Sequence, residues 1–456
     1  MDNENKRTIL AIAALSTFLV GFTSSSVNIA LPSIGFELEM DAVLLGWVAT
    51  SYILASATTL LPFGRLADIR GRKRIFAWGI IIFIISALLL VFVPSAWSLI
   101  LLRVIQGVGT AMIFSTGIAI VTSVFPAGER GKALGITAAT TYLGLTLGPV
   151  VGGVLTQYFG WRSIFLASVL LGVIIASLLR VKIKGEWAEA KGEKFDFTGS
   201  LIYSLALIGI IYGFSLLPDR LGVWLIIAGA AGIFAFVRQQ TRVRHPLLDV
   251  NLFRENRVFA FSNLACLLNY SAAFAVSFLM SLYLQYIKGL SPQNAGLILV
   301  VMPAVQAAFS PVAGRLSDRI EPRILASIGM GLITVGLALF IFLSDNTSSG
   351  FILGVLITIG LGFGFFASPN TNAVMSSVKQ RLYGVASAVL ATMRQVGMTF
   401  SLGITMLLFA LYLGRVEITP EYHPLFLESI RTAFIIFTVL CSVGIFASLA
   451  RGNTSR

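Results

Sequence analysis

Charged residues are scarce in this chain of 456 residues. Asp, Glu, Lys and Arg together make up 12% of it, about half of the roughly 25% that soluble domains carry. Since so few charges would not keep a protein of 49.0 kDa in water, a large soluble enzyme is excluded. Cysteine is almost absent too. Cys266 and Cys441 both lie in apolar runs, so neither a disulfide framework nor a thiolate metal site is expected.

Groups that exchange protons near neutral pH are missing from the apolar runs. All twenty Asp and Glu residues and both histidines, His245 and His423, fall between these runs or at their ends. Catalysis inside a membrane needs a nucleophile, a base or metal ligands at depth. We therefore expect no enzyme, no catalytic residue, no cofactor and no metal. A non-transporting sensor is an alternative, although loops of at most about 20 residues leave no soluble domain for it.

Apolar runs dominate the rest of the chain. Hydrophobic residues make up 57% of it and the mean hydropathy is +0.90. Runs long enough to cross ~30 Å of hydrocarbon recur, with helical rather than alternating periodicity. This pattern predicts an all-α polytopic membrane protein with fourteen spans. The expected spans are 8–31, 42–63, 75–93, 98–124, 132–155, 162–180, 197–217, 222–239, 258–285, 292–313, 323–343, 349–375, 384–413 and 430–450.

The net charge of +13 fits membrane topology better than nucleic-acid binding. With a cytoplasmic N-terminus, the inner side of the fourteen spans carries 26 Lys and Arg residues and the outer side five. Basic residues gather in cytoplasmic loops, so both termini are expected in the cytoplasm, in a multi-pass protein of the cytoplasmic membrane. The first apolar run continues to about Leu31, which favours a span over a cleaved signal peptide.

One short pattern occurs twice. Residues 64–68 read GRLAD after the second span, and residues 314–319 read GRLSDR after the second of the last six spans. The repeat indicates a duplicated architecture, and duplicated bundles commonly rock about a binding site near the bilayer midplane. We expect a six-helix bundle over 1–180, a linker with two inserted helices over 181–257, and a second six-helix bundle over 258–456.

Four segments carry a resemblance to a known family. Residues 64–74 read GRLADIRGRKR, 103–109 RVIQGVG, 144–153 GLTLGPVVGG and 27–32 VNIALP. In this order they resemble the signatures of the major facilitator superfamily, and with the inserted spans they resemble its fourteen-span drug/proton antiporter family. The resemblance implies the major facilitator fold and proton-driven multidrug efflux. The family pattern has an Asp where this chain has Thr23, so the usual coupling carboxylate is absent at that position.

The repeated loops contain the residues expected to hold one transporter state. Asp68 lies among basic residues, so it can pair with them or lie against a helix N-terminus of the opposite half. Such a contact would latch one state and release in the other. The alternative is an ordinary solvated basic loop. The expected latch residues are Gly64, Asp68, Gly71, Arg72 and Lys73, with Gly314, Asp318 and Arg319 in the second half.

Small residues recur every four positions in the fifth span, so they lie on one helix face. Such stripes let transmembrane backbones pack closely, and the proline among them favours a kink. Gly144, Gly148, Pro149, Gly152 and Gly153 are therefore expected to form a helix-packing seam rather than to contact a substrate. The family resemblance implies that this seam seals the cavity in exchangers.

Two arginines are the charges expected within spans. A charge deep in a bilayer costs roughly 2.5–3.5 kcal/mol even on the lenient insertion scale. Arg103 lies about one turn from the outer end of its span, where snorkelling is the alternative to a cavity role. Arg394 lies ~15 Å into its span at 1.5 Å per residue. It is expected to face a cavity, the alternative being a buried contact with backbone carbonyls.

Polar residues near mid-depth complete a mostly apolar pocket with a few orienting groups, although each of them alone could form an interhelical hydrogen bond instead. The expected cavity residues are Ser24, Asn28, Arg103, Gln106, Tyr142, Asn263, Asn269, Tyr270, Gln306, Arg394 and Gln395. Arginines without carboxylates disfavour lipophilic cations. The residues therefore predict neutral or anionic substrates.

The sequence as a whole predicts a secondary transporter that exports amphipathic organic solutes or drugs by alternating access, with proton coupling implied by the family resemblance. The alternative is an exporter of organic anions that is not coupled through a mid-membrane carboxylate. Expected partners are a small organic substrate, protons and the lipid bilayer, without nucleic acid. The chain is expected to act as a monomer.

Overall fold

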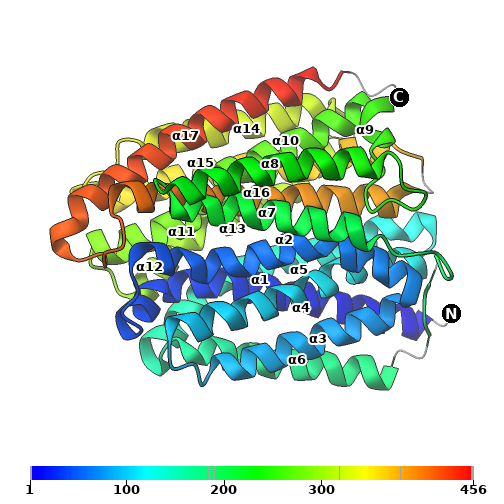
Figure 1. Ribbon diagram of the computed structural model, residues 1–456, viewed down its shortest axis with the longest axis horizontal. Helices are drawn as coiled ribbons and strands as arrows, with labels where there is room; N and C mark the ends of the chain where they lie inside the picture. Colours follow the sequence, from blue (N-terminus) through cyan, green and yellow to red (C-terminus); the bar gives the residue numbers. More distant parts are fainter. Residues whose placement is uncertain (1–2, 183–184, 189, 318, 380–381, 453–456) are drawn as a thin grey trace.

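The computed structural model describes residues 3–182, 185–188, 190–317, 319–379 and 382–452. In these ranges every regular element is a helix, and fourteen helical segments are long and apolar enough to cross a membrane. The segments run side by side along the long axis of the molecule, and both ends of the chain lie at the same end of it (Figure 1). This end is called the terminal face below, and the opposite end the distal face.

The elements follow one another with short connections. The first eight spans are α1 (Asn3–Glu37), α2 (Ala42–Arg70), α3 (Arg72–Leu90), α4 (Ala96–Val124), α5 (Ala127–Phe159), α6 (Arg162–Lys182), α7 (Phe197–Leu216) and α8 (Arg220–Gln240). After the short α9 (Asn251–Glu255), the ninth span consists of α10 (Arg257–Ala273), α11 (Ala275–Leu282) and the π-helical turn η1 (Tyr283–Ile287). The tenth is formed by α12 (Pro292–Leu299) and α13 (Val301–Leu316). The last four are α14 (Pro322–Phe340), α15 (Ser349–Ser376), α16 (Tyr383–Tyr412) and α17 (His423–Ala450), the last preceded by the 3₁₀ turn η3 (Pro420–Tyr422).

The first two helices run past the ends that the sequence predicts. The expected spans stop near residues 31 and 63, beside Pro32 and Pro62, yet α1 continues to Glu37 and α2 to Arg70. In a membrane, neighbouring helices and hydroxyl groups can satisfy the backbone groups that a proline frees. A proline therefore bends such a helix without ending it.

Helices α1 and α5 pack with almost no side chain between them. A Cβ atom on Gly144 would lie 2.4 Å from the carbonyl oxygen of Phe18, and one on Gly152 would lie 2.7 Å from Cβ of Ser26. Ser26 Oγ also donates to the carbonyl oxygen of Gly148 at 3.0 Å. The three glycines predicted to share a face thus all lie along α1.

The other two seam residues lie on a different face of α5, against α12. A Cβ on Gly153 would lie 2.6 Å from the carbonyl oxygen of Pro292, and one on Gly296 would lie 2.2 Å from that of Pro149. The fifth span therefore packs closely both against the first span and against the tenth.

The inserted pair α7–α8 covers the line where α2 meets α16. Helix α7 packs on both of them, and α8 packs on α7. Ser204 Oγ donates at 3.0 Å to the carbonyl oxygen of Thr58, and Tyr203 Oη donates at 2.9 Å to that of Ala57. Thr58 lies four residues before Pro62, which has no N–H to donate. The inserted helix thus supplies the hydrogen bond that the kink in α2 removes.

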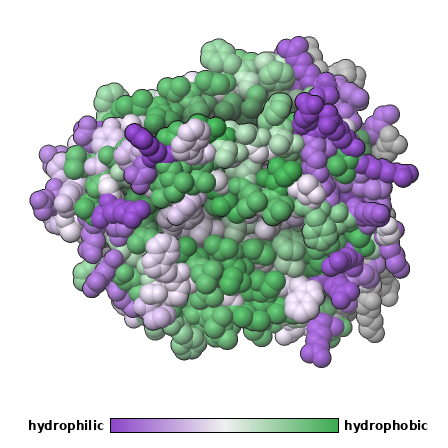
Figure 2. All heavy atoms as spheres, in the orientation of Figure 1, coloured by the Kyte–Doolittle hydropathy of each residue, from purple (hydrophilic) through white to green (hydrophobic). Residues whose placement is uncertain are grey.

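The surface divides into an apolar belt and two polar ends. Figure 2 shows hydrophobic residues across the middle of the molecule and hydrophilic residues gathered at the terminal and distal faces. Large exposed side chains such as Trp78, Phe234 and Phe446 belong to spanning helices. A belt of this kind matches the hydrocarbon layer of a bilayer.

Arg451, one of the basic residues that the charge count assigns to the cytoplasmic side, is buried. Arg451 follows α17 and is 1% exposed. Its guanidinium donates to the carbonyl oxygen of Ser448 at 2.8 Å and to Ser262 Oγ at 3.3 Å. Burial lowers the pKa of Arg451 to about 10, because desolvation disfavours the charged form. This arginine caps the end of a helix rather than facing water.

Candidate solute-binding cavity

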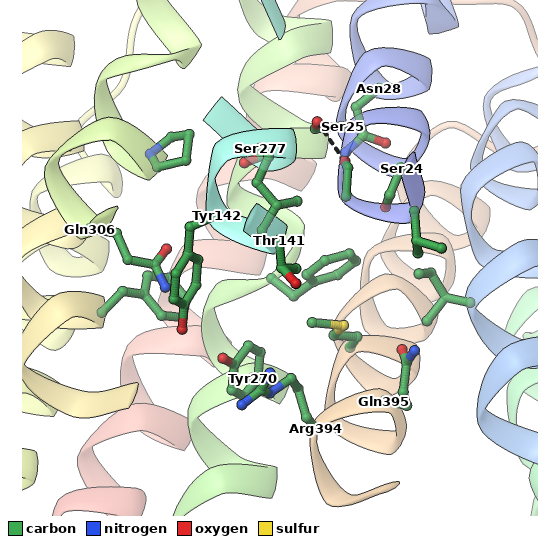
Figure 3. A pocket seen from close by; sticks show the side chains of 18 of the residues that line it. Ser24, Ser25, Asn28, Thr141, Tyr142, Tyr270, Ser277, Gln306, Arg394 and Gln395 are labelled. Atoms are coloured by element: carbon green, nitrogen blue, oxygen red, sulfur yellow. Dashed lines mark hydrogen bonds between the residues drawn. The ribbon is translucent and has the colours of Figure 1, made fainter. Parts of the chain in front are cut away.

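A central cavity of about 200 Å³ lies between the early and the late spans. Its lining comes from α1, α2, α4 and α5 on one side and from α10, α11, α12, α13, α15 and α16 on the other. The apolar part includes Phe114, Phe274 and Phe363. Polar side chains from both sides point into the space (Figure 3).

The structure brings seven of the predicted cavity residues together. Ser24, Asn28, Tyr142, Tyr270, Gln306, Arg394 and Gln395 all line the central cavity. Gln395 Nε2 donates to Ser56 Oγ of α2 at 3.2 Å, so one lining residue of α16 also links the two sides. Sequence reasoning missed Ser25, Tyr52 and Thr141, since a hydroxyl within an apolar span gives no sign of the direction it faces.

Arg394 is the lining residue with a full charge. Its guanidinium carbon lies 5.2 Å from the centre of the Tyr270 ring, within cation–π range. One turn later on α16, a Cβ on Gly397 would lie 2.6 Å from the carbonyl oxygen of Leu267, so α16 approaches α10 closely enough to set the arginine over the ring. Nε of Arg394 is buried without a hydrogen-bond partner. No salt bridge to Arg394 occurs within the described part of the chain, and the lining includes no carboxylate.

Arg103 lies outside the cavity lining, contrary to the expectation from sequence. It is 1% exposed and donates to the carbonyl oxygen of Val48 at 3.1 Å and to Gln106 Oε1 at 2.6 Å. Its guanidinium carbon lies 4.1 Å from the centre of the Tyr52 ring, and Tyr52 itself lines the cavity. Arg103 and Gln106 therefore lie behind the wall, where the arginine supports Tyr52 from its outer side.

Asn263 and Asn269 also lie outside the lining. Both are fully buried in α10. Asn263 Nδ2 donates to the carbonyl oxygen of Phe259 at 2.9 Å, while both amide atoms of Asn269 have no partner. The seven-residue spacing from Asn263 to Tyr270 does place these residues along one helix, but only Tyr270 reaches the cavity. The late spans thus hold a buried polar interior of their own.

A second cavity of about 600 Å³ lies between the central one and the terminal face. Leu60, Phe114, Ile118 and Ala391 line both spaces. These shared residues place the two cavities next to each other. This larger space is called the vestibule below.

The predicted latch residues of the first half lie at the vestibule. Gly64, Asp68 and Arg72 line it. Asp68 Oδ1 pairs with Arg72 Nη2 at 2.7 Å, and Arg72 also hydrogen-bonds Ser123 of α4. Asp68 is thus held within its own half in this state, whereas the sequence left open a contact with the opposite half.

The loop that follows α6 packs against the turn between α2 and α3. The carboxylate of Glu186 accepts from the backbone N–H groups of Lys73 at 2.8 Å and Arg74 at 3.2 Å, which caps the N-terminus of α3. Gly71 has a φ of +113°, and a Cβ there would lie 2.5 Å from the Glu186 carboxyl carbon. Glycine at position 71 therefore allows both the turn and the close approach of Glu186.

Two of the three latch residues of the second half, Gly314 and Arg319, lie within the described residues. Gly314 lies in α13, where a Cβ would lie 2.8 Å from Ser368 Oγ of α15. The backbone N–H of Arg319 donates to the carbonyl oxygen of Leu316 at 3.0 Å. Asp318 lies outside the described residues. The described residues include no group of three or more His, Cys, Asp or Glu side chains that could hold a metal ion.

Fourteen spanning helices around a mostly apolar central cavity with a few polar groups are the architecture of a membrane transporter. The chain matches the model of the Major Facilitator Superfamily over residues 13–402, and it belongs to this family. The members of the family are transporters rather than enzymes. The family predicted from the four sequence segments is therefore confirmed, as is a multi-pass protein of the cytoplasmic membrane.

Curated relatives share about a third of their residues with this chain. It is 30% identical over 404 residues to the riboflavin transporter RibZ of Clostridioides difficile, covering 88% of this chain and 87% of that protein. It is 29% identical over 411 residues to the multidrug resistance protein Stp of Mycobacterium tuberculosis, covering 88% and 75%. The cephamycin export protein CmcT of Amycolatopsis lactamdurans is 31% identical over 407 residues, covering 87% and 84%.

Solved structures show the same fold at low sequence identity. A bacterial homologue of the human lysosomal transporter Spinster, in an inward-facing conformation, superimposes with a TM-score of 0.71 at 16% identity, covering 99% of this chain and 98% of that one. The nucleoside transporter NupG gives a TM-score of 0.68 at 14% identity, covering 98% and 99%.

Proposed function

We propose that this protein exports amphipathic organic solutes from the cytoplasm by alternating access. The observation that carries the proposal is the central cavity, which is lined from both sides, is mostly apolar and contains a few polar groups. Such a lining suits solutes that combine a ring system with one or two polar groups. The relatives named above include transporters of riboflavin, of drugs and of a cephamycin, all organic solutes of moderate size.

The terminal face is the cytoplasmic side in this proposal. The excess of Lys and Arg residues in the loops on that side supports the orientation. The vestibule then lies on the cytoplasmic side of the central cavity, and solute enters the cavity from this side. The bundles formed by spans one to six and nine to fourteen would rock about the cavity, with α7–α8 following α2 and α16.

The charge of the lining favours neutral and anionic solutes. Arg394 has no carboxylate beside it, so a lipophilic cation entering the cavity would meet an unopposed positive charge in a poorly hydrated space. An anion would replace the missing counter-charge. The same absence of carboxylates argues that protons, if they drive export as in the family, are carried by Asp68 at the vestibule or by the solute itself.

Flux in proteoliposomes tests the proposal. The probes are a naphthalenesulfonate anion and the N-methylquinolinium cation, which share a two-ring scaffold, each measured with and without a pH gradient. We expect saturable flux of the anion above that of empty vesicles, increased by the gradient. No saturable flux of either probe under any gradient would contradict the proposal for solutes of this class. Monomeric protein in the same vesicles, measured by single-molecule photobleaching, would support the expected monomer.

A further inference from the structure

The segment VNIALP at residues 27–32 has a structural role that the cavity does not explain. Pro32 lies within α1 and has no backbone N–H. The carbonyl oxygen of Asn28, four residues earlier, therefore loses its helical hydrogen bond. A freed carbonyl at membrane depth needs another donor. Ser281 Oγ of α11, from the opposite side of the cavity, donates to it at 2.6 Å.

A second side chain from the same span reaches the next carbonyl. Gln285 Nε2 donates to the carbonyl oxygen of Ile29 at 3.0 Å and lies 3.1 Å from Ser281 Oγ. Gln285 lies in η1, a π-helical turn, and such turns are frequent at functional sites. Two neighbouring side chains of the ninth span thus bind two consecutive carbonyl groups of the first.

These hydrogen bonds lie directly next to the cavity, on its distal side. Asn28 lines the cavity (Figure 3), while its carbonyl group accepts the hydrogen bond from Ser281. Ser277, one turn before Ser281 on α11, also lines the cavity. Ser281 and Ile29 are themselves fully buried. A solute between Asn28 and Ser277 would therefore touch the two helical turns that carry these bonds.

We propose that Ser281 and Gln285 are the distal gate of the transport cycle: Ser281 binds the backbone carbonyl of Asn28 that Pro32 frees in α1, and Gln285 binds the next carbonyl, that of Ile29. The proposal rests on the transport function above. When the distal side opens, α1 and α11 separate and water replaces the two donors. The bonds therefore favour the closed state only while the gate is dry. Solute contact with Asn28 and Ser277 biases the opening of the gate.

This gate differs from the glycine contacts that close the same side. The contacts of Gly153 and Gly296 between α5 and α12 depend on shape alone. The Ser281 contact depends on one missing N–H group. The substitution Pro32→Ala restores that N–H group and gives the Asn28 carbonyl a donor within its own helix. Ser281 then becomes dispensable. If Ser281 served only to pack the two helices together, Pro32→Ala would not make it dispensable.

Thiol labelling from the distal face measures how often the gate is open. Cys266 and Cys441 are replaced by Ala, and Ser24→Cys supplies the reporter in the cavity. The proteoliposomes are selected for protein whose C-terminus lies inside the vesicle, where added protease does not cut it. In this orientation a membrane-impermeant maleimide added outside reaches only the distal face. We expect Ser281→Ala to raise the labelling rate about ten-fold, which corresponds to about 1.4 kcal/mol. Gln285→Leu should raise it less, because Ser281 remains, and Ser281→Thr should restore the slow rate.

The double mutant Pro32→Ala/Ser281→Ala distinguishes the loss of the gate hydrogen bond from a general loosening of the helix packing. In the Pro32→Ala background, Ser281→Ala should change labelling less than about three-fold, since coupled residues are not additive. Thr358→Ala is the matched control, because this hydroxyl donates only to the carbonyl oxygen of Gly354 in its own helix. Equal labelling of Ser281→Ala and Thr358→Ala would overturn the proposal, as would a ten-fold effect that persists with Ala at position 32. Loss of solute flux with the labelling pattern intact would count against the proposed solutes and support the gate.

Discussion

Replacing Arg394 removes the charge that the cavity offers to a solute. The side chain is half-buried, lies 5.2 Å from the Tyr270 ring centre and has no carboxylate partner among the described residues. A unit anion at 4 Å would gain about 4 kcal/mol of Coulomb energy at an effective dielectric constant near 20. Desolvation of the anion consumes part of this, and charge-assisted hydrogen bonds contribute about 1.5–3 kcal/mol net. Arg394→Gln should therefore weaken anion binding roughly 10- to 150-fold.

Equilibrium binding to the purified protein tests this value. The dissociation constant is measured for a naphthalenesulfonate and for the uncharged naphthalenesulfonamide. In Arg394→Gln the sulfonate should lose its affinity while the sulfonamide changes less than about three-fold, because the neutral group gains little from the charge. Arg394→Lys should lie between the two, since it keeps the charge but not the planar fork over Tyr270. Equal losses for sulfonate and sulfonamide would refute the reasoning, because the arginine would then act only on the shape of the cavity.

Three further variants test the packing and the caps by thermal unfolding in detergent. Gly148→Ala would place a Cβ 1.9 Å from Ser25 Oγ and should destabilise the protein by about 1–3 kcal/mol through overpacking; an unchanged melting temperature would contradict the tight α1–α5 contact. Ser204→Ala removes the donor to Thr58 and should lower stability by about 1–3 kcal/mol, whereas Ser177→Ala, whose hydroxyl bonds within its own helix, should not. Glu186→Gln weakens the cap on α3 and should lower the free energy of unfolding by about 0.5–2 kcal/mol. An unchanged melting temperature would show that this carboxylate does not hold the loop against the turn.

The two arginines show how far the sequence leads and where it stops. Hydropathy alone identifies both as charges within spans, because a charge stands out in an apolar run. Arg394 lines the cavity and Arg103 does not. The difference arises from neighbours distant in sequence. The carbonyl oxygen of Val48 accepts a hydrogen bond from Arg103, and the ring of Tyr52 covers the face of its guanidinium group. The periodicity of a sequence predicts which residues share a helix face, but it does not predict which neighbouring helix covers that face.

The prolines give the second lesson. The expected spans end beside Pro32 and Pro62, yet both helices continue past these residues. Whether a helix ends or bends depends on a donor supplied from elsewhere, and here the donors are Ser281, 253 residues from its acceptor, and Ser204, 146 residues from its acceptor. The four-residue spacing of the glycines in α5, by contrast, is local information, and the face that it predicts is the one that packs against α1.

The central claim is that one unopposed arginine sets the charge of the solutes that this transporter moves. The most direct measurement is the ratio of kcat/KM for naphthalenesulfonate to that for N-methylquinolinium in the same proteoliposomes, for the unmodified protein and for Arg394→Glu. The account predicts a ratio well above one that falls below one when the charge is reversed. A ratio at or below one for the unmodified protein, or one that Arg394→Glu leaves unchanged, would contradict it.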